Sequence, residues 1–135
     1  MEELFENWEA QPALTDAGAA ELAEVCRAVL DMKKGNNIAV IRVEGRSDIT
    51  DYLVLCSANS NTHVAALSGE LEFRLAQRGV QPLHTDGGNA RNWQVVDYGT
   101  VMVHIFDREA REFYNLDKLY REPSKAEAGT ATEVL

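Results

Sequence analysis

The sequence predicts an α/β protein with a small mixed β-sheet and helices packed against it. Two observations lead to this prediction: apolar residues recur every three or four positions in two long segments, and apolar runs of strand length stand between and after them. The segments follow one another as helix, strand, strand, helix, strand, strand, helix. Such interleaving is typical of helices that pack on a sheet within one layered domain. At 135 residues the chain is long enough for one domain with a substantial core.

The first predicted helix carries a single apolar stripe. Thr15 or Asp16 can cap its start with a side-chain oxygen, and Gly35 is expected to end it in a left-handed conformation. A first strand over residues 38–43 follows, and its near-continuous apolar character predicts cover on both faces. The stripe recurs at i, i+3, i+4, i+7 and i+8 and consists of Leu22, Val25, Cys26, Val29 and Leu30.

The middle of the chain predicts a second strand and a second helix. The loop over residues 44–51 leads into a strand over residues 52–57, and Ser60 is one of the side chains that can cap the following helix. Gly79 follows the last apolar position and ends this helix. One face of the helix is apolar and consists of Val64, Leu67, Leu71 and Leu75.

The last third of the chain predicts a β-hairpin and then a short polar helix. Two apolar strand runs flank the turn residues 97–100, which are Asp, Tyr, Gly and Thr. Asp107 stands where a carboxylate can cap a helix that starts at Arg108, and a short element over residues 115–120 follows. Before the hairpin, residues 84–91 contain two glycines and no periodicity, so we expect a mobile loop there.

The two ends differ from the α/β domain between them, which we place at residues 14–121. Residues 1–13 carry large apolar side chains, Trp8 among them, between carboxylates. This pattern fits an amphipathic arm that docks on the domain or a partner, but a flexible, frayed end is the commoner outcome and the one we expect. Residues 122–135 are rich in small and polar types and are expected to form a disordered tail.

The charge of the chain bears on its partners and its compartment. A net charge of -9 and a pI of about 4.7 argue against nonspecific binding to nucleic acid, which needs a basic surface. An acidic surface is attracted to basic partners, although acidity also serves solubility alone. The N-terminus is acidic where a signal peptide would be basic, and no apolar run approaches the roughly 18 residues that span a bilayer. We therefore expect a cytoplasmic protein without membrane contact.

No pattern in the chain is typical of a metal or cofactor site. Cys26 and Cys56 form no CxxC pair and stand in apolar patterns, so we expect buried, inert thiols in a reducing compartment. His63, His84 and His104 are too far apart in sequence to form a helical ligand pair. We predict neither a metal nor a cofactor.

One ordered set of motifs resembles a known family. Trp93 is followed by Val-Asp before a tight turn, then by Val-His-Ile-Phe around His104, then by an Arg-x-x-Tyr-x-Leu-x-x-Leu run that starts at Arg111. Earlier blocks that fit in the same order cover residues 33–37, 45–52 and 60–64. Together, from about residue 19 to residue 120, they resemble the ribosomal silencing factor family, also called the Iojap-like family.

The resemblance implies a fold, a partner and a mechanism. The fold would be similar to that of the nucleotidyltransferases, and the protein would dock on the large ribosomal subunit through large-subunit protein number fourteen. Bound there, it would occlude the small subunit and repress translation under nutrient limitation or in stationary phase. Organellar members instead assist large-subunit assembly, and isolated members tend to be homodimers. Apolar residues on both faces of residues 101–106 also favour self-association.

A fold similar to nucleotidyltransferases would suggest an enzyme, and the residues argue against it. Such enzymes hold two metal ions with carboxylates two positions apart on a strand, after a Gly-Ser loop. The candidates here, Asp48 and Asp51, are three positions apart, and Ser47 has no glycine beside it. We therefore predict a binding protein without catalysis, and a degenerate nucleotidyltransferase is the alternative.

The predicted partner-binding site consists of Asp86, Trp93, Asp97, Tyr98 and His104. Asp97 and Tyr98 lie at the hairpin turn, where we expect both side chains to be exposed. Trp93 is either a core residue or an aromatic anchor of the interface. His104 lies within a strand and is either a partly buried, hydrogen-bonded residue or a partner contact.

Overall fold

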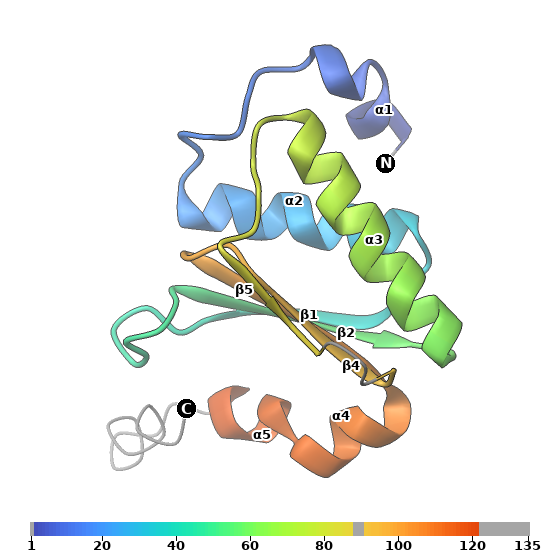
Figure 1. The fold of residues 1–135 in the computed structure, drawn as a ribbon. Helices are drawn as coiled ribbons and strands as arrows, with labels where there is room; N and C mark the ends of the chain where they lie inside the picture. The colour runs from blue at the N-terminus through green and yellow to red at the C-terminus, as the bar shows by residue number, and fades with distance from the viewer. Residues whose placement is uncertain (1, 88–90, 122–135) are drawn as a thin grey trace.

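A five-stranded mixed sheet with helices on both faces forms the centre of the molecule (Figure 1). The computed structural model describes residues 2–87 and 91–121. Its elements are α1 (Glu2–Phe5), η1 (Trp8–Ala10), α2 (Ala19–Met32), β1 (Asn36–Arg42), β2 (Tyr52–Ala58), α3 (Asn61–Gln77), β3 (His84–Asp86), β4 (Trp93–Asp97), β5 (Val101–Asp107), α4 (Arg108–Tyr114) and α5 (Leu116–Arg121). The predicted α/β class is confirmed. None of the helices in these residues is long and apolar enough to cross a bilayer.

The strand order is β1-β2-β5-β4-β3, which puts β5 at the centre of the sheet. β2 and β5 run parallel, whereas β4 and β5 form the predicted antiparallel hairpin. β1 and β3 are the two edges, and each pairs antiparallel with its one neighbour. The prediction that the first strand is covered on both faces holds only in part. Ile38 packs against the core of one face and Ala39 and Ile41 pack against that of the other, but no residue of this edge strand is fully buried.

The two faces of the sheet are covered to different extents. α2 and α3 lie on one face, and α4 and α5 lie on the other (Figure 1). The α2–α3 face carries the larger core, in which both predicted helix stripes are buried. The opposite face carries a smaller core around Leu53, Leu55 and Phe106, packed against Ala110 and Leu116 of the two short helices. We call these the closed face and the open face.

The predicted ends of α3 and α4 are confirmed. Ser60 Oγ accepts a hydrogen bond from the His63 backbone N–H at 3.1 Å, and Asp107 Oδ1 accepts one from the Ala110 backbone N–H at 2.8 Å. Each bond satisfies a backbone donor that has no partner within its own helix. Gly79 follows α3 with a φ of 87°, a left-handed conformation that glycine adopts without strain.

The predicted ends of α2 are wrong at both termini. The helix starts after Gly18 without a side-chain cap, so neither Thr15 nor Asp16 caps it. At the other end Lys34, and not Gly35, adopts the left-handed conformation, with a φ of 71°. Gly35 is required for space instead, because a Cβ there would overlap the sulfur of a buried cysteine in β2.

The N-terminal segment packs on the domain within its described residues. Trp8 is 3% exposed, and its Nε1 donates to the carbonyl oxygen of Arg74 in α3 at 2.9 Å. The guanidinium carbon of Arg78 lies 4.5 Å from the Trp8 ring centroid, a cation–π contact. The structure therefore has this segment as a docked arm, and its expected flexibility stays a prediction. The tail expected at residues 122–135 lies outside the described residues.

The segment expected to be a mobile loop begins with a strand. Residues 84–86 form β3, in which Thr85 lies opposite Val96 of β4. The loop prediction is therefore wrong at its start. The strand is only three residues long and polar, so it has no apolar periodicity by which sequence could reveal it. Residues 88–90 lie outside the described residues.

Candidate partner-binding site

The part of the open face that α4 and α5 leave uncovered forms a pocket of about 450 Å³. Four of the five predicted binding residues line it, namely Asp86, Trp93, Asp97 and His104. Two of the other lining residues come from distant segments: Ile49, from the loop before β2, and Tyr114, from α4. These two were not predicted. The available signal was a large apolar side chain in a polar segment, alone at Ile49 and next to Phe113 at Tyr114, and each of the two is 47% exposed.

Strand register explains why these side chains meet. In the β4–β5 pair, Val95 lies opposite His104 and Asp97 lies opposite Met102. In the β3–β4 pair, Asp86 lies opposite Val95. Residues directly opposite each other in an antiparallel pair point to the same face, so alternate residues of three strands converge on the pocket.

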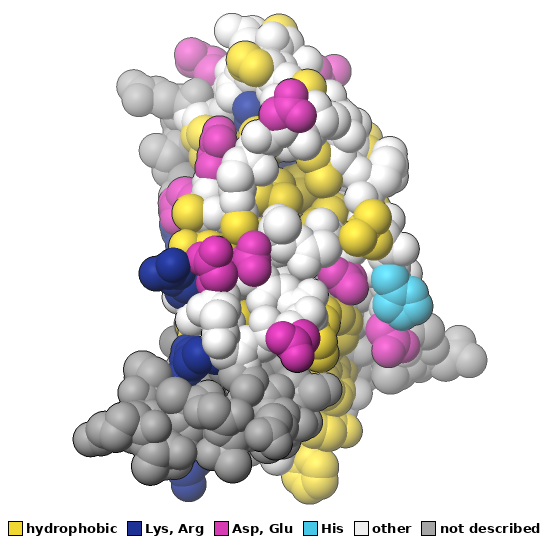
Figure 2. Space-filling view, turned by 90° about the vertical axis from the view of Figure 1, so that its left-hand side faces the viewer, with side chains coloured by type: hydrophobic (Ala, Val, Ile, Leu, Met, Phe, Trp, Pro, Cys, Tyr) yellow, Lys and Arg dark blue, Asp and Glu magenta, His cyan; other side chains and the backbone are white. Residues whose placement is uncertain are grey.

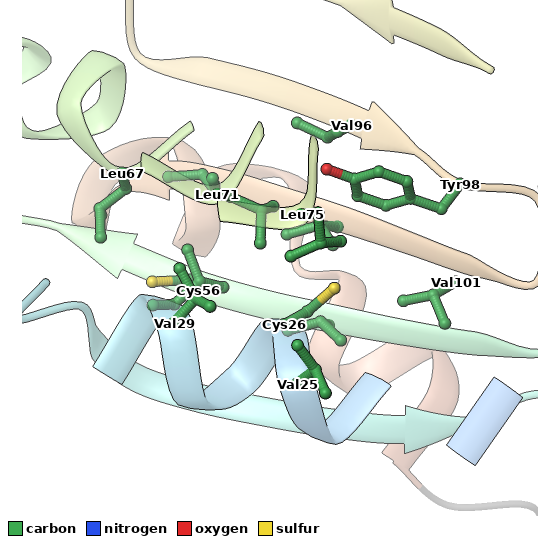
Figure 3. Close-up of a cluster of buried hydrophobic side chains, with 14 of the residues drawn as sticks. Val25, Cys26, Val29, Cys56, Leu67, Leu71, Leu75, Val96, Tyr98 and Val101 are labelled. Carbon is green, nitrogen blue, oxygen red and sulfur yellow. The ribbon is translucent and has the colours of Figure 1, made fainter. Parts of the chain in front are cut away.

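Tyr98 lies on the closed face, and the prediction that it is exposed is wrong. It follows Asp97 by one position, so its side chain points to the face of Val96 and joins the α2–α3 core, where it is 8% exposed. Its hydroxyl oxygen points into the cluster (Figure 3). Among the described residues that oxygen has no hydrogen-bond partner, and burial raises the pKa of the hydroxyl. The alternation Val96-x-Tyr98 was the signal that would have placed it correctly.

Trp93 and His104 form a hydrogen-bonded pair on the pocket floor. Trp93 Nε1 donates to His104 Nδ1 at 3.1 Å, and the two ring centroids are 5.8 Å apart. The indole also contacts the rings of Tyr114 and Phe106, with centroid separations of 4.1 and 5.9 Å. Trp93 is half-buried. It therefore contributes to the core of the open face with one part of its surface and to the pocket with another.

His104 is neutral, and its proton lies on one defined nitrogen. The side chain is 6% exposed, and burial lowers its pKa from 6.5 to about 4. Because an indole N–H only donates, the nitrogen that faces Trp93, Nδ1, must be the acceptor. A neutral imidazole that accepts at Nδ1 carries its proton on Nε2. The expectation of a buried, hydrogen-bonded histidine is confirmed.

Two carboxylates make one rim of the pocket acidic. Asp86 Oδ1 accepts from the Gly87 backbone N–H at 2.7 Å, and Asp97 Oδ1 accepts from the Gly99 backbone N–H at 2.8 Å. Gly87 has a φ of 119°, and a Cβ there would approach the Trp93 carbonyl oxygen to 2.6 Å, so this turn requires glycine. Within the described residues neither aspartate forms an ion pair. Both charges are therefore available to a partner.

The residues considered for catalysis or metal binding take part in the structure in other ways. Ser47 Oγ accepts from the Ile49 backbone N–H at 3.1 Å in the loop before β2. Cys26 and Cys56 are free, buried thiols, as predicted, and burial raises the pKa of each to about 12. In the part of the chain that the structure describes, no group of three or more His, Cys, Asp or Glu side chains could hold a metal ion.

The fold and the pocket together define a class of protein. An aromatic and apolar hollow with a charged rim, carried by a small α/β domain, has the composition of a surface that binds another macromolecule. The chain belongs to the ribosomal silencing factor family: residues 16–134 match the family described as "Ribosomal silencing factor during starvation". The resemblance found in the sequence is thereby confirmed.

Individual relatives agree with this assignment. The ribosomal silencing factor RsfS of Haemophilus influenzae is 37% identical over 99 residues, which are 73% of this chain and 97% of that protein. "Mitochondrial assembly of ribosomal large subunit protein 1" of Mus musculus is 30% identical over 114 residues, 82% of this chain and 50% of that protein.

Two solved structures share the fold. One, from Bacillus halodurans, is 30% identical with a TM-score of 0.67 and covers 75% of this chain and 94% of its own. The other, from Chromobacterium violaceum, has a TM-score of 0.74 at 24% identity, covers 79% of this chain and 91% of its own, and supports the fold alone.

Proposed function

We propose that this protein binds the large ribosomal subunit through the pocket on its open face and thereby blocks joining of the small subunit. It represses translation in the cytoplasm under nutrient limitation. Membership of a family described by ribosomal silencing during starvation supports the proposal. The structural observation behind it is the pocket that unites Trp93, His104 and the two rim aspartates. The direct partner is large-subunit protein number fourteen, at the inter-subunit surface.

The surroundings of the pocket support a protein partner. Trp93 is a half-buried aromatic residue of the kind that anchors interfaces. Ile49 and Tyr114 extend the apolar surface beside it, and Phe113, whose ring centroid lies 5.0 Å from that of Tyr114, is 80% exposed. An exposed apolar patch beside charged residues is typical of a binding surface.

The charge of the molecule supports a basic partner. The chain has a net charge of -9, and acidic side chains lie among hydrophobic ones on the side of the molecule shown in Figure 2. Such a protein is repelled by bare phosphate backbones and attracted by the basic proteins embedded in them. Recognition therefore involves ribosomal protein, without direct specificity for nucleic acid. Occlusion needs no chemistry beyond binding, in agreement with the predicted absence of catalysis.

The test uses purified large subunits, sedimentation on a gradient and an assay of subunit joining. Trp93→Ala should weaken binding at least about thirtyfold and restore joining, because truncation of a well-packed interface aromatic commonly costs about 2 kcal/mol or more. Tyr114→Ala tests the same surface with a smaller loss of packing, because Tyr114 is 47% exposed and Trp93 is less exposed. Phe73→Ala is the matched control, an exposed aromatic on α3.

Circular dichroism and thermal melting distinguish a lost interface from a lost fold. The proposal needs variants that stay folded and no longer bind. Folded Trp93→Ala and Tyr114→Ala proteins that bind large subunits as tightly as the wild type would place the interface elsewhere.

Large-subunit assembly is the second candidate function, and the printed name of the mouse relative favours it. The two functions differ in what accumulates when the gene is deleted. Loss of an assembly factor leaves immature large subunits in growing cells. Loss of a silencing factor leaves mature subunits that stay joined during starvation.

We also propose that the free protein is a homodimer whose interface overlaps the pocket. The reason given by the sequence is wrong, because β5 lies at the centre of the sheet and most of its residues are buried. Exposed apolar side chains lie at the pocket instead: Ile49 and Tyr114 line it, and Phe113 contacts Tyr114. Light scattering that detects only monomer at high micromolar concentration would contradict the dimer. A dimer that stays intact on large subunits would contradict the overlap.

A further inference from the structure

One hydrogen-bond donor in the pocket has no acceptor within residues 2–87 and 91–121. Trp93 occupies Nδ1 of His104, so the proton of the neutral ring lies on Nε2. Among the described residues no atom accepts from Nε2, although the side chain is 6% exposed and lines the pocket. Among the described residues Nε2 is not one of the fully buried polar atoms without a partner, so water can reach it from the pocket. An occupant that displaces this water must bring an acceptor, or the donor loses its hydrogen bond at a cost in free energy.

We propose that His104 determines the specificity of the pocket. Its Nε2–H donates to a neutral carbonyl oxygen of a basic segment of the partner protein, which lies between the Trp93 ring and the rim aspartates. This inference rests on the proposed function, in that the pocket must bind a partner protein, and it specifies the chemistry that the partner presents.

The rim carboxylates select a neutral acceptor over a charged one. Asp86 and Asp97 line the same pocket as His104. A carboxylate brought to Nε2 would be repelled by both of these negative charges. A backbone carbonyl oxygen has no net charge, so this repulsion is absent. Each aspartate uses Oδ1 for a backbone N–H and keeps Oδ2 for a Lys or Arg of the incoming segment. The pocket of about 450 Å³ is large enough for a few side chains.

Trp93 has a second role in this arrangement, because it sets the tautomer of His104. Without the indole N–H, the neutral imidazole could place its proton on either nitrogen, and the Nδ1–H form offers no donor at Nε2. The 3.1 Å bond from Trp93 therefore prepares the donor before the partner arrives. Such preorganisation reduces the conformational entropy that is lost on binding.

Two substitutions separate the two ring nitrogens. His104→Gln places an amide nitrogen near the position of Nε2, which keeps the donor and removes the acceptor for Trp93. His104→Asn places an amide oxygen near the position of Nδ1, which keeps the acceptor and removes the donor. With purified large subunits as the probe, we expect His104→Asn to bind about tenfold more weakly than wild type, and His104→Gln within about threefold of it. Phe73→Ala is again the control for a substitution outside the pocket.

The tautomer of His104 can be measured on the wild-type protein, so this test does not depend on whether a variant folds. Histidine ¹⁵N chemical shifts distinguish the protonated from the unprotonated ring nitrogen. We expect protonated Nε2 and unprotonated Nδ1 at His104 at neutral pH. The opposite tautomer would overturn the inference, as would folded Asn and Gln variants with equal affinity or a Gln variant weaker than the Asn variant.

The Trp93→Ala and Tyr114→Ala variants separate failure of this inference from failure of the proposed function. If Tyr114→Ala weakens binding while the two His104 variants bind equally, the pocket is the interface and only the role of His104 is wrong. If neither aromatic substitution alters binding, the proposed function fails first. If the His104 variants alter only the monomer–dimer equilibrium in ultracentrifugation, the occupant is a second copy of the chain, and the inference is overturned.

Discussion

The closed and open faces of the sheet are built from alternate residues of the same strands, yet they serve different purposes. On the closed face α2 and α3 cover a core that includes Val96, Tyr98 and Val103. On the open face two short helices cover only the part around Phe106, and the remainder is the pocket around Trp93. The amount of cover, and not the type of residue, distinguishes the stabilising surface from the surface that we propose binds a partner.

Two aromatic residues, Trp93 and Tyr98, show the same difference between the two faces. Trp93 and Tyr98 are five positions apart, so they point to opposite faces of the strand and its extension. Trp93 is half-buried and lines the pocket, whereas Tyr98 is part of the closed core. Position within the strand repeat therefore predicts the role better than the chemistry of the ring.

The largest expected effect is on the closed face. Leu71 is fully buried in α3, and Leu71→Ala should lower the free energy of unfolding by roughly 2–5 kcal/mol, through lost burial and the cavity left behind. Phe73→Ala, two positions along the same helix at 59% exposure, should change it by less than about 0.5 kcal/mol. Urea denaturation measures both. Similar values for the two variants would mean that the closed face is not the stabilising one.

The next effect is a pH dependence that originates on the open face. The folded-state pKa of His104 is lowered to about 4 from 6.5, so between these values the unfolded chain binds a proton that the folded protein does not. The contribution to stability is complete above pH 6.5, falls as the pH falls, and is lost by about pH 4. The shift corresponds to about 3 kcal/mol.

His104→Gln isolates this contribution. The carboxylates titrate in both proteins, so the difference between their stability–pH curves reports on position 104 alone. We expect the wild-type curve to be steeper between pH 6.5 and 4. Parallel curves over that range would show that His104 is not buried in its neutral form.

A smaller effect of opposite sign is expected at Tyr98. Its hydroxyl is buried without a partner in the described part of the chain, so Tyr98→Phe should stabilise the fold by about 1 kcal/mol while the ring keeps its packing. Thermal melting would detect the rise. Binding to large subunits should be unchanged, because the closed face does not reach the pocket. A less stable variant would reveal a hydrogen bond to this hydroxyl.

The smallest effect concerns the acidic rim. Asp86→Asn combined with Asp97→Asn removes two charges and keeps the oxygens that accept from Gly87 and Gly99. Association with large subunits should slow by severalfold and become less sensitive to salt, because exposed charges steer association over about 8 Å at physiological ionic strength. Stopped-flow binding at two salt concentrations measures this. An Asp16→Asn control, which removes an exposed charge outside the pocket, should leave the rate unchanged.

The sequence predicts most elements of this fold because helix and strand periods are local properties. Leu67, Leu71 and Leu75 repeat with the helical period, and the hairpin is marked by its turn residues. The position of a strand in the sheet is not local. The apolar run in β1 predicts a fully covered strand, whereas β1 is a partly covered edge, because the parallel pairing of β2 with β5 places the later strand at the centre.

Most of the candidate site could also be predicted from the sequence, because most of its residues are marked by local patterns. Asp86, Trp93, Asp97 and His104 come from one continuous stretch, where local motifs and alternation identify them. Ile49 reaches the pocket only through tertiary structure. The composition of the turn predicts an exposed Tyr98, but the alternation of the strand, which places Tyr98 on the face of Val96, predicts the buried position that it has.

The central place of β5 in the sheet governs when the chain can fold during its synthesis. β1 and β2 are neighbours in sequence and can pair early, as can β3 and β4. Only β5, near the end of the described chain, joins these two pairs. Until it leaves the exit tunnel, β2 and β4 both present an unpaired edge, and the pairing of β2 with β5 spans a long stretch of sequence and is slow to form. The nascent chain therefore has no complete pocket floor until β5 has been synthesised and has paired with β2 and β4.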